Sequence, residues 1–333
     1  MNTPARILLL AAIALIVVLP PAPGETPRTG RNQLSAKGYV RLNTWAQAND
    51  FYVRWLDRDR TLELSNGLAR LVFTVDPHQD SRKARINGTE VWLALPLVSQ
   101  NGSVCLSQID IAETMKPLLS PPSNPPGMTI QCICLDPGHG GKDPGFQVGS
   151  QDEKKYTLLL AKELRDQLKR AGLKVVLTRT TDTFVERAAR TEAARKQGAD
   201  LFVSLHFNSA GGQHPEVKGL EVYCLTPEGA FSTNAGGEGD KRGCTGNRNN
   251  EKNMLLAYQL QKSMVRSLSI EDRGVHRARF EVLRDAAMPA ILIEGGYMSN
   301  PGEGGKIFDP AYRRQMARAI VEGILAYKRT VNG

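Results

Sequence analysis

From residue 128 onward, short apolar runs alternate with longer segments in which apolar residues recur every three or four positions. Continuous apolar runs of this length are typical of strands that are buried on both faces of a sheet. They predict strands at residues 130–135, 173–177, 199–206, 219–224, 280–283 and 290–294.

The segments between these runs have the periodicity of helices. Leu160, Leu164 and Leu168 lie four residues apart in segment 153–171, and Gly172 follows as a helix stop. Similar patterns predict helices at residues 185–196, 253–267 and 310–328. Strands separated by helices predict a three-layer α/β domain, in which a mostly parallel central sheet is flanked by helices. We expect this domain to span residues 128–329.

Residues 38–119 follow a different pattern. Short apolar runs are separated by turn signals that include Asn87-Gly88 and Asn101-Gly102. Asn-Gly between apolar runs is a strong hairpin signal. With a short helix expected at residues 108–118, this region is predicted to be a small β-rich α+β domain. The proline-rich segment 120–127 is the expected linker to the larger domain.

Residues 1–24 have the pattern of a secretory signal peptide. Arg6 precedes an apolar run over residues 7–19, which is followed by a proline-rich segment. The run is shorter than the about 20 apolar residues that a spanning helix needs, so a signal peptide is favoured and an uncleaved anchor is the alternative. We therefore expect an exported protein, in the periplasm, the cell wall or the extracellular space, with no stable membrane span after signal cleavage.

The chain is basic, since 43 Lys and Arg residues against 34 Asp and Glu residues give a formal net charge of +9. This charge favours contact with anionic polymers such as cell wall, or with lipid headgroups. A nucleic-acid partner is not expected, because an exported protein rarely meets one and the chain has no run of five or more basic residues.

The chain has five cysteines. Cys132 and Cys134 lie two apart in an expected strand and therefore share one face, which places them poorly for a bond with each other. Cys224 and Cys244 bracket a Gly/Asn-rich loop and could close it as a disulfide, although their spacing alone does not decide this.

Four polar residues lie at the ends of the expected elements: His139, Glu153, His206 and Glu294. His139 follows a strand in a glycine-rich turn, Glu153 opens a helix, and His206 and Glu294 end strands. Because the ends of parallel strands meet at one edge of an α/β sheet, we expect one cleft that contains all four.

Three of these residues form a candidate metal site. His139, Glu153 and His206 offer the two imidazoles and one carboxylate found in some zinc hydrolases. Their spacing does not match a His-Glu-x-x-His helix, so the metal would be held by separate elements. From spacing alone the alternative is a turn histidine, a helix N-terminal carboxylate favoured by the helix dipole, and a strand-end histidine.

Glu294 is the candidate general base. A carboxylate at the end of an apolar strand costs free energy unless it is compensated. Gly295 and Gly296 beside it would let a bulky substrate approach the backbone. Proton transfer during metal-assisted hydrolysis is the expected role, and an ion pair with Arg284 is the alternative.

Seven motifs in this order resemble the zinc-dependent N-acetylmuramoyl-L-alanine amidases, the amidase type 3 family. They are Leu135-Asp-Pro-Gly-His-Gly-Gly-Lys-Asp-Pro-Gly145, Glu153-Lys154, Leu177-Thr-Arg179, Arg187, Ser204-Leu-His-Phe-Asn208, Gly219-Leu-Glu-Val-Tyr223 and Ile293-Glu-Gly-Gly-Tyr-Met-Ser-Asn300. The resemblance implies one Zn²⁺ per chain on His139, Glu153 and His206, with Glu294 as the catalytic carboxylate.

The resemblance also implies a reaction and its partners. It implies hydrolysis of the amide bond between N-acetylmuramic acid and L-alanine in peptidoglycan, which releases stem peptides during cell-wall remodelling or cell separation. Peptidoglycan is the expected partner, and an activator protein is a further one to consider. The alternatives are a zinc peptidase that acts on wall peptides and a non-catalytic wall-binding regulator.

Residues 38–119 resemble a second family, the copper amine oxidase N-terminal-like domain. The resemblance rests on the order of Asn87-Gly88, the run Leu93-Ala-Leu-Pro96, Asn101-Gly102 and the closing helix. It implies a folded module without a copper site of its own.

Weaker candidates surround the expected site. Asp136 and Asn208 flank the expected ligands and could orient them, with turn formation as the alternative. Arg179 and Arg187 could bind an acidic stem peptide or form local ion pairs. The stretch 227–250 is the least family-like, and its Gly/Asn-rich composition predicts an open, mobile loop.

Overall fold

A computed structural model describes residues 38–75, 81–210, 214–234 and 240–332. The expected signal peptide, residues 1–24, lies outside the described residues. Residues 38–333 cluster as one compact unit. No helix of the described residues is long and apolar enough to cross a membrane.

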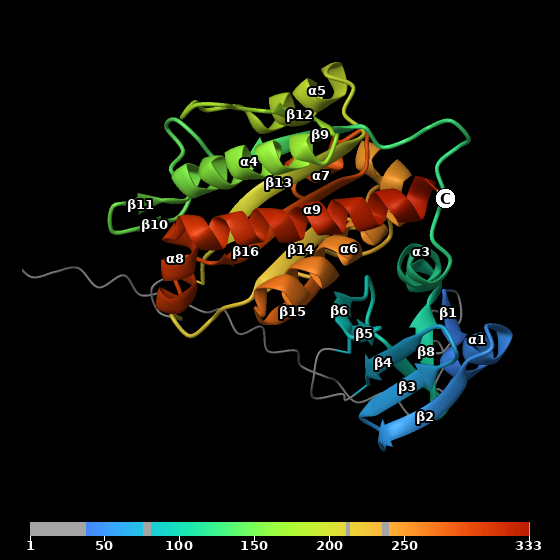
Figure 1. The fold of residues 1–333 in the computed structure, drawn as a ribbon. Coiled ribbons are helices and arrows are strands. Elements are labelled where there is room, and N and C mark those ends of the chain that lie inside the picture. The colour runs from blue at the N-terminus through green and yellow to red at the C-terminus, as the bar shows by residue number, and fades with distance from the viewer. Residues whose placement is uncertain (1–37, 76–80, 211–213, 235–239, 333) are drawn as a thin grey trace, which may run out of the picture. The chain divides into compact units, whose positions relative to one another are not determined.

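The described residues contain a sheet of 11 strands, in the order β12-β9-β13-β16-β14-β15-β6-β5-β4-β3-β2 (Figure 1). Strands β12, β9, β13 and β16 are parallel, whereas β14 is antiparallel to β16 and parallel to β15. The expected mostly parallel central sheet is therefore confirmed. These six strands are β9 (Cys132–Pro137), β12 (Lys174–Leu177), β13 (Leu201–Asn208), β14 (Leu220–Leu225), β15 (Asp272–Ala278) and β16 (Ala290–Tyr297).

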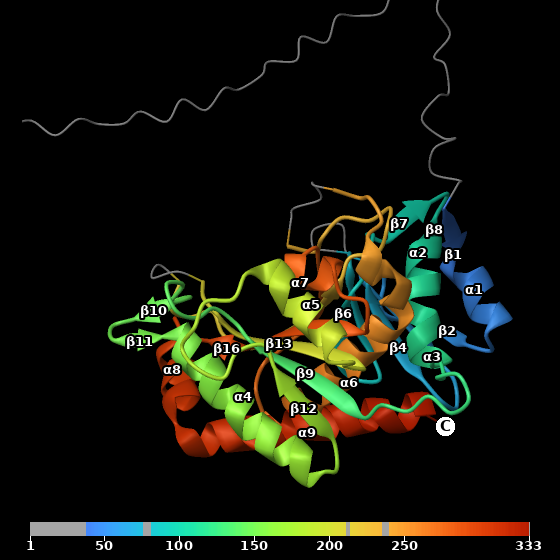
Figure 2. The ribbon, with the colours of Figure 1, turned by 90° about the horizontal axis from the view of Figure 1, so that it is seen from above.

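Helices flank these strands on both faces, as Figure 2 shows. One face packs against the long helices, and the other carries two shorter ones. The first group is α4 (Glu153–Arg170), α6 (Asn250–Leu268) and α9 (Pro310–Asn332), and the second is α5 (Arg187–Lys196) and α7 (Glu281–Arg284). Helix α8 (Pro301–Phe308) follows β16, and the hairpin of β10 (Gln147–Val148) and β11 (Gln151–Asp152) precedes α4.

Strand β9 shows how side-chain alternation divides the core. Ile133 and Leu135 belong to the apolar cluster that contains Leu160 of α4. Cys132 and Cys134 belong to the cluster on the opposite face. Since successive side chains of a strand point to opposite faces, an unbroken apolar run is what a sheet covered on both faces requires.

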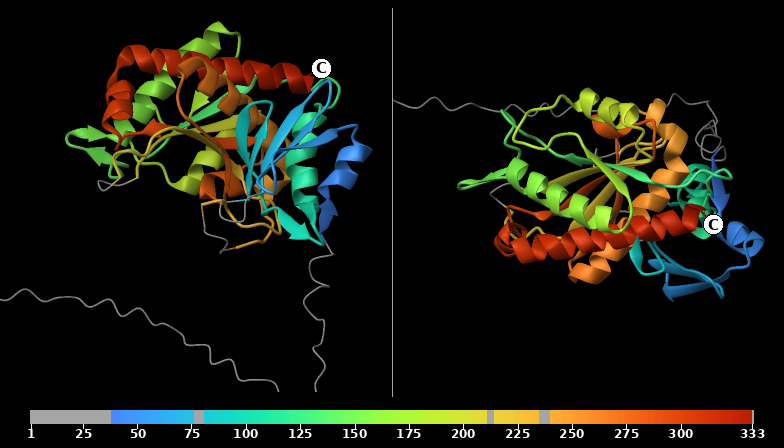
Figure 3. Two further views of the ribbon diagram at one scale, coloured as in Figure 1. Left: turned by 90° about the horizontal axis from the view of Figure 1, so that it is seen from below. Right: turned by 45° about the horizontal axis from the view of Figure 1, so that its top comes forward.

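The upstream strands continue the same sheet as an antiparallel meander, seen as blue and cyan strands in Figure 3. The meander is β2 (Tyr52–Asp57), β3 (Thr61–Ser65), β4 (Arg70–Thr74), β5 (Lys83–Ile86) and β6 (Thr89–Trp92). A separate small sheet holds β1 (Tyr39–Arg41), β8 (Ser103–Ser107) and β7 (Val98–Gln100). The helical segments are α1 (Leu42–Ala48), α2 (Gln108–Asp110), the π-helical η1 (Ile111–Met115) and α3 (Lys116–Leu119).

The meander joins the larger part of the sheet through β6 and β15, which are parallel at Val91 and Val275. Trp92 Nε1 donates a hydrogen bond of 3.0 Å to the Arg273 carbonyl, and the Trp92 ring stacks on His276. Nearby, the fully buried Arg277 guanidinium donates to Thr114 Oγ1 at 2.7 Å. Polar and aromatic contacts therefore hold this joint together.

One predicted strand is wrong. Residues 280–283 were expected to be a strand, but 281–283 lie in helix α7, which Phe280 precedes, and β15 lies just upstream. A short apolar run does not distinguish a strand from a buried helical turn. Strand β15 has no such run, because its buried side chains include His276 and Arg277.

The disulfide between Cys224 and Cys244 that the spacing left open is not formed, and both residues are free thiols. The loop expected over 227–250 is also partly ordered. It includes the 3₁₀-helix η2 (Thr245–Asn249) and buried residues such as Ala230 and Thr233. The Thr233 hydroxyl group forms a hydrogen bond of 3.1 Å with His276 Nδ1, so this stretch packs against β15.

His276 predicts a pH-dependent stability of the joint. Its ring is buried between Trp92 and Tyr223, and this burial lowers its pKa from 6.5 to about 4. Between these pH values the unfolded chain binds a proton at this histidine and the folded chain does not. The free energy of unfolding therefore falls as the pH falls, by about 3 kcal/mol over the whole range.

Urea unfolding between pH 7 and pH 4.5 tests this prediction. We expect His276→Gln to lose less stability over this range than the parent chain. His214 is exposed, and a His214→Gln control should leave the slope unchanged. Parallel curves for the parent chain and His276→Gln would contradict the prediction.

Candidate active site

The loop that carries His139 begins where β9 ends. His139 has a φ of +61°, in the left-handed region that a non-glycine residue adopts at a cost. Two buried arginines hold this loop. Arg179 donates to the carbonyls of Pro137 and Gly138 at 3.0 and 2.8 Å, and Arg190 donates to the His139 carbonyl at 3.0 Å. The surrounding chain therefore fixes a backbone conformation that would otherwise be unfavourable.

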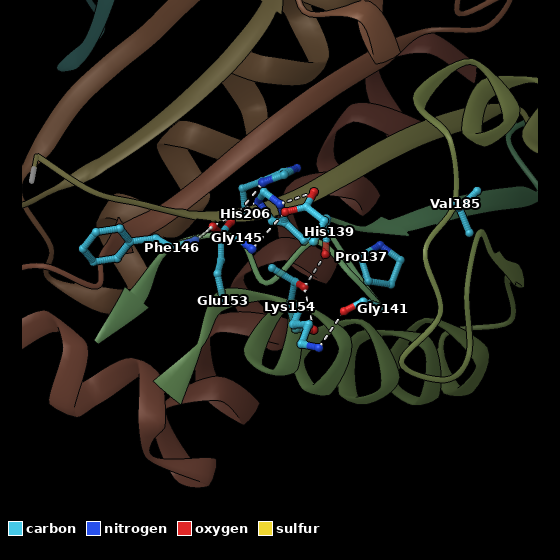
Figure 4. Close-up of polar contacts among 12 residues, drawn as sticks. Pro137, His139, Gly141, Gly145, Phe146, Glu153, Lys154, Val185 and His206 are labelled. Atoms are coloured by element: carbon cyan, nitrogen blue, oxygen red, sulfur yellow. Dashed lines mark hydrogen bonds and ion pairs between the residues drawn. The ribbon is translucent and has the colours of Figure 1, made fainter. Parts of the chain in front are cut away.

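Three side chains converge at the end of the sheet (Figure 4). Glu153 Oε2 lies 3.0 Å from His139 Nε2, and Glu153 Oε1 lies 3.0 Å from His206 Nδ1. One ligand atom from each of the three residues lies within 4.8 Å of the others. The structure thus brings together the three residues expected to bind a metal.

Glu153 is buried at the first position of α4. The backbone N–H groups of Phe146 and Phe207 donate to its carboxylate at 3.0 and 3.2 Å. Burial alone would raise the pKa of Glu153, but the hydrogen bonds and charges of the two imidazoles lower it well below the usual value. The N-terminal end of a helix also favours a negative charge. The carboxylate is therefore ionised.

Asp143 is a functional candidate that the sequence pattern did not reveal. Its Oδ2 atom lies 2.9 Å from His139 Nδ1, on the opposite side of the ring from Glu153. A carboxylate in this position fixes the tautomer and orientation of a metal-binding histidine. The available signal was an aspartate four residues after His139 in the same glycine-rich turn.

Glu294 lies beside this cluster, because β16 pairs with β13 so that Glu294 is opposite His206. Its Oε2 atom is buried and has no hydrogen-bond partner in the part of the chain that the structure describes. Burial, followed by the charges of Glu153 and Glu221, raises its pKa well above the usual value. The alternative ion pair with Arg284 is absent from the described residues.

Glu221 faces Glu294 from the other side, where β14 and β16 are antiparallel. Tyr223 and Tyr297 each donate a hydroxyl hydrogen bond of 2.7 Å to its carboxylate, and Arg273 forms an ion pair with it. Burial opposes its ionisation, but nearby His276 and these hydrogen bonds keep its pKa below the usual value. Two neighbouring glutamates thus have opposite environments, and the sequence pattern singled out only Glu294.

All four expected site residues line one cleft with a volume of about 790 Å³. Phe146, Phe184 and Phe280 add aromatic surface to its lining. Arginines and glutamates from α5, α7 and the adjoining chain form another part of the wall. The expected single cleft at the strand ends is therefore present.

The residues expected to orient the ligands or to bind the stem peptide have different contacts. Asp136 is buried in an ion pair with Arg190, and Asn208 donates to Glu221, so neither bonds to an expected metal ligand. Arg179 is buried in the His139 loop, which excludes it from direct contact with a stem peptide. Arg187 does line the cleft.

The other histidines among the described residues lie elsewhere. His214 is exposed beside Glu216, and His276 is buried in the joint between β6 and β15. Neither belongs to the His139, Glu153 and His206 group.

Comparison with known proteins gives consistent results. A family model described as N-acetylmuramoyl-L-alanine amidase matches residues 133–326. The N-acetylmuramoyl-L-alanine amidase AmiC of Neisseria meningitidis is 34% identical over 221 residues, which covers 60% of this chain and 53% of the relative. AmiA of Escherichia coli is 33% identical over 221 residues, which covers 59% of this chain and 75% of the relative. The chain thus spans about half the length of the Neisseria relative.

Solved structures agree over the same part of the chain. N-acetylmuramoyl-L-alanine amidase AmiC2 of Nostoc punctiforme has a TM-score of 0.51 at 35% identity, covering 61% of this chain and 99% of that one. An N-acetylmuramoyl-L-alanine amidase from Clostridium difficile 630 has a TM-score of 0.52 at 32% identity, covering 62% and 100%. Because the family model matches more than half of the sequence, the chain belongs to the N-acetylmuramoyl-L-alanine amidase family.

Proposed function

We propose that this protein is a zinc-dependent N-acetylmuramoyl-L-alanine amidase. Its reaction is hydrolysis of the amide bond between the lactyl group of N-acetylmuramic acid and L-alanine in peptidoglycan. The observation that carries the proposal is the buried Oε2 atom of Glu294, which has no hydrogen-bond partner among the described residues and lies in the same cleft as three converging metal-ligand candidates. Family membership supports the choice of substrate.

The donor set fits zinc. Two imidazoles and one ionised carboxylate are a known zinc-hydrolase combination, and Asp143 holds His139 so that Nε2 faces the other donors. His139, Glu153 and His206 would hold the ion. When bound, zinc supplies a Lewis acid that polarises the scissile carbonyl group and lowers the pKa of water.

Glu294 has the environment of a general base that later acts as an acid. Its raised pKa makes the carboxylate more basic than an exposed one. It takes a proton from the attacking water, whose oxygen joins the lactyl carbonyl carbon. As the carbon–nitrogen bond breaks, Glu294 delivers the proton to the amine of L-alanine. Glu221 stays ionised and hydrogen-bonded throughout.

The proposal includes export and a protein partner. The wall substrate and the signal-like pattern of residues 1–24 both favour action outside the cytoplasm. The CwlD amidase from Clostridioides difficile, which has a TM-score of 0.50 at 25% identity to this chain, forms a complex with the GerS lipoprotein. A protein that binds and activates this chain is therefore part of the proposal.

Mass spectrometry of muramidase-digested peptidoglycan tests the reaction. After incubation with the zinc-loaded protein, we expect free peptides that begin at L-alanine, peptide-free glycan, and loss of both on chelation. Shortened peptides that are still attached to muramic acid would instead identify a peptidase. Unchanged muropeptides in the presence of bound zinc and candidate activators would contradict an amidase and favour a wall-binding protein.

Substitutions should separate metal binding from proton transfer. We expect Glu294→Gln to keep its zinc and to lower turnover by at least about 100-fold, because an amide cannot accept the proton. We expect His206→Ala to lower the zinc content itself. Zinc content and turnover are measured on the same preparations, with Glu192→Gln, on the exposed side of α5, as the unaffected control. Near-normal turnover by Glu294→Gln would remove its proposed role.

Two glycines between β9 and α4 provide a matched test of the metal site. Gly145 and Gly149 have φ values of +67° and +58°, so alanine is strained at both positions. A Cβ atom at Gly145 would lie 2.6 Å from Glu153 Oε2 and 2.7 Å from His139 Cδ2, whereas one at Gly149 meets nothing within 4 Å. We expect Gly145→Ala to weaken zinc binding at least about tenfold relative to Gly149→Ala, by competition with a chelator dye. Equal affinities would contradict this.

A further inference from the structure

Four arginines line the cleft, and the fold already uses two of them. Arg190 is buried against Asp136 at 2.8 Å and also holds the His139 loop. Arg279 donates to the carbonyls of Arg242 and Pro227 at 2.7 and 2.9 Å, which ties it to the chain that follows β14. Neither guanidinium group is free to rearrange around a ligand.

The other two arginines remain available. The Arg187 side chain is 73% exposed, and its nearest charged partner, Glu281 Oε2, is 3.9 Å away, beyond hydrogen-bond distance. Arg284 is exposed, its backbone N–H donates to the Phe280 carbonyl, and its guanidinium group has no hydrogen bond or ion pair within the part of the chain that the structure describes. Arg187 begins α5 and Arg284 ends α7, and these helices contact each other on the same face of the sheet.

We propose that Arg187 and Arg284 form a subsite for a carboxylate of the substrate's peptide. The proposal rests on the proposed amidase function and adds a specificity determinant to it. A guanidinium group presents parallel N–H donors that match the two oxygens of a carboxylate. The glycan of the proposed substrate has uncharged N-acetyl groups, whereas the acidic stem peptide carries carboxylates. The wall formed by α5 and α7 therefore receives the peptide.

The charges of this wall agree with an anionic ligand. Arg187, Arg279 and Arg284 outnumber Glu186 and Glu281 among its lining residues by three to two. Asp136 neutralises Arg190. Over the whole cleft the lining carboxylates outnumber the arginines by six to four, so the excess of positive charge is confined to this wall. Glu281 is the competing anion, because its Oε2 atom lies 3.9 Å from the Arg187 guanidinium group.

A pair of muropeptides tests the subsite. The two probes have a muramoyl tripeptide in common and differ only in a free carboxylate or a carboxamide at the residue after L-alanine. With the full-length, zinc-loaded protein we expect kcat/KM to favour the acid by at least about tenfold. The Arg187→Gln/Arg284→Gln double variant should lose this preference mainly through a higher KM for the acid.

Two further variants make the test specific. Arg195 is an exposed arginine of α5 that pairs with Glu192 and does not line the cleft. We expect Arg195→Gln to keep the parental preference. Glu281→Gln removes the competing anion, so it should strengthen the preference for the acid. A general loss of folding would not abolish the preference for the acid in the double variant while Glu281→Gln strengthens it.

Dissociation constants of both probes for zinc-loaded Glu294→Gln protein separate the subsite from the reaction. Tighter binding of the acid, lost when both arginines are replaced, supports the subsite even if neither probe is hydrolysed by the parent protein. Equal binding of acid and amide, or a preference that persists in the double variant, overturns the subsite while hydrolysis still supports the amidase.

Discussion

The Glu153 carboxylate is the constraint on which the site depends. Each of its oxygens faces one imidazole at 3.0 Å and one backbone N–H group, so a shift of this carboxylate disturbs both histidines and two loops. The packing leaves no room for side chains at the neighbouring glycines, since a Cβ atom at Gly138 would lie 2.2 Å from the His206 ring. The glycine-rich sequence after β9 is thus required by close packing as well as by its turns.

The change of strand direction at β14 places a second carboxylate beside the site. Because β16 lies between parallel β13 and antiparallel β14, Glu294 has His206 on one side and Glu221 on the other. Glu221 receives donors from two tyrosines and Arg273, which stabilise its charge. Glu294 Oε2 has no donor within the described ranges, and Glu294 is the group whose pKa is raised. Hydrogen-bond donors therefore keep the Glu221 carboxylate ionised, whereas burial and the absence of donors to Oε2 among the described residues leave Glu294 with a raised pKa.

Sequence patterns predicted the features that depend on local periodicity. The leucines of α4 and the polar ends of β13 and β16 follow from spacing along the chain, and these features were sufficient to predict that four candidate residues share one cleft. Asp143, Arg190 and Glu221 were not assigned their roles, because each acts through partners from other elements. Strand β15 was missed for a related reason, since its buried His276 and Arg277 are compensated by distant residues. The boundary between regions 38–119 and 128–329 stays a prediction.

Strand β15 connects the upstream meander to the candidate site. Its Arg273 side chain forms the ion pair with Glu221, while the Arg273 carbonyl accepts hydrogen bonds from Trp92 of β6 and from His276. One residue thus contacts both the upstream meander and the carboxylate that faces Glu294. Hydrogen bonds to a main-chain carbonyl restrict the position of the backbone from which the guanidinium group extends. The upstream meander therefore belongs to the framework that positions Glu221, although none of its described residues lines the cleft.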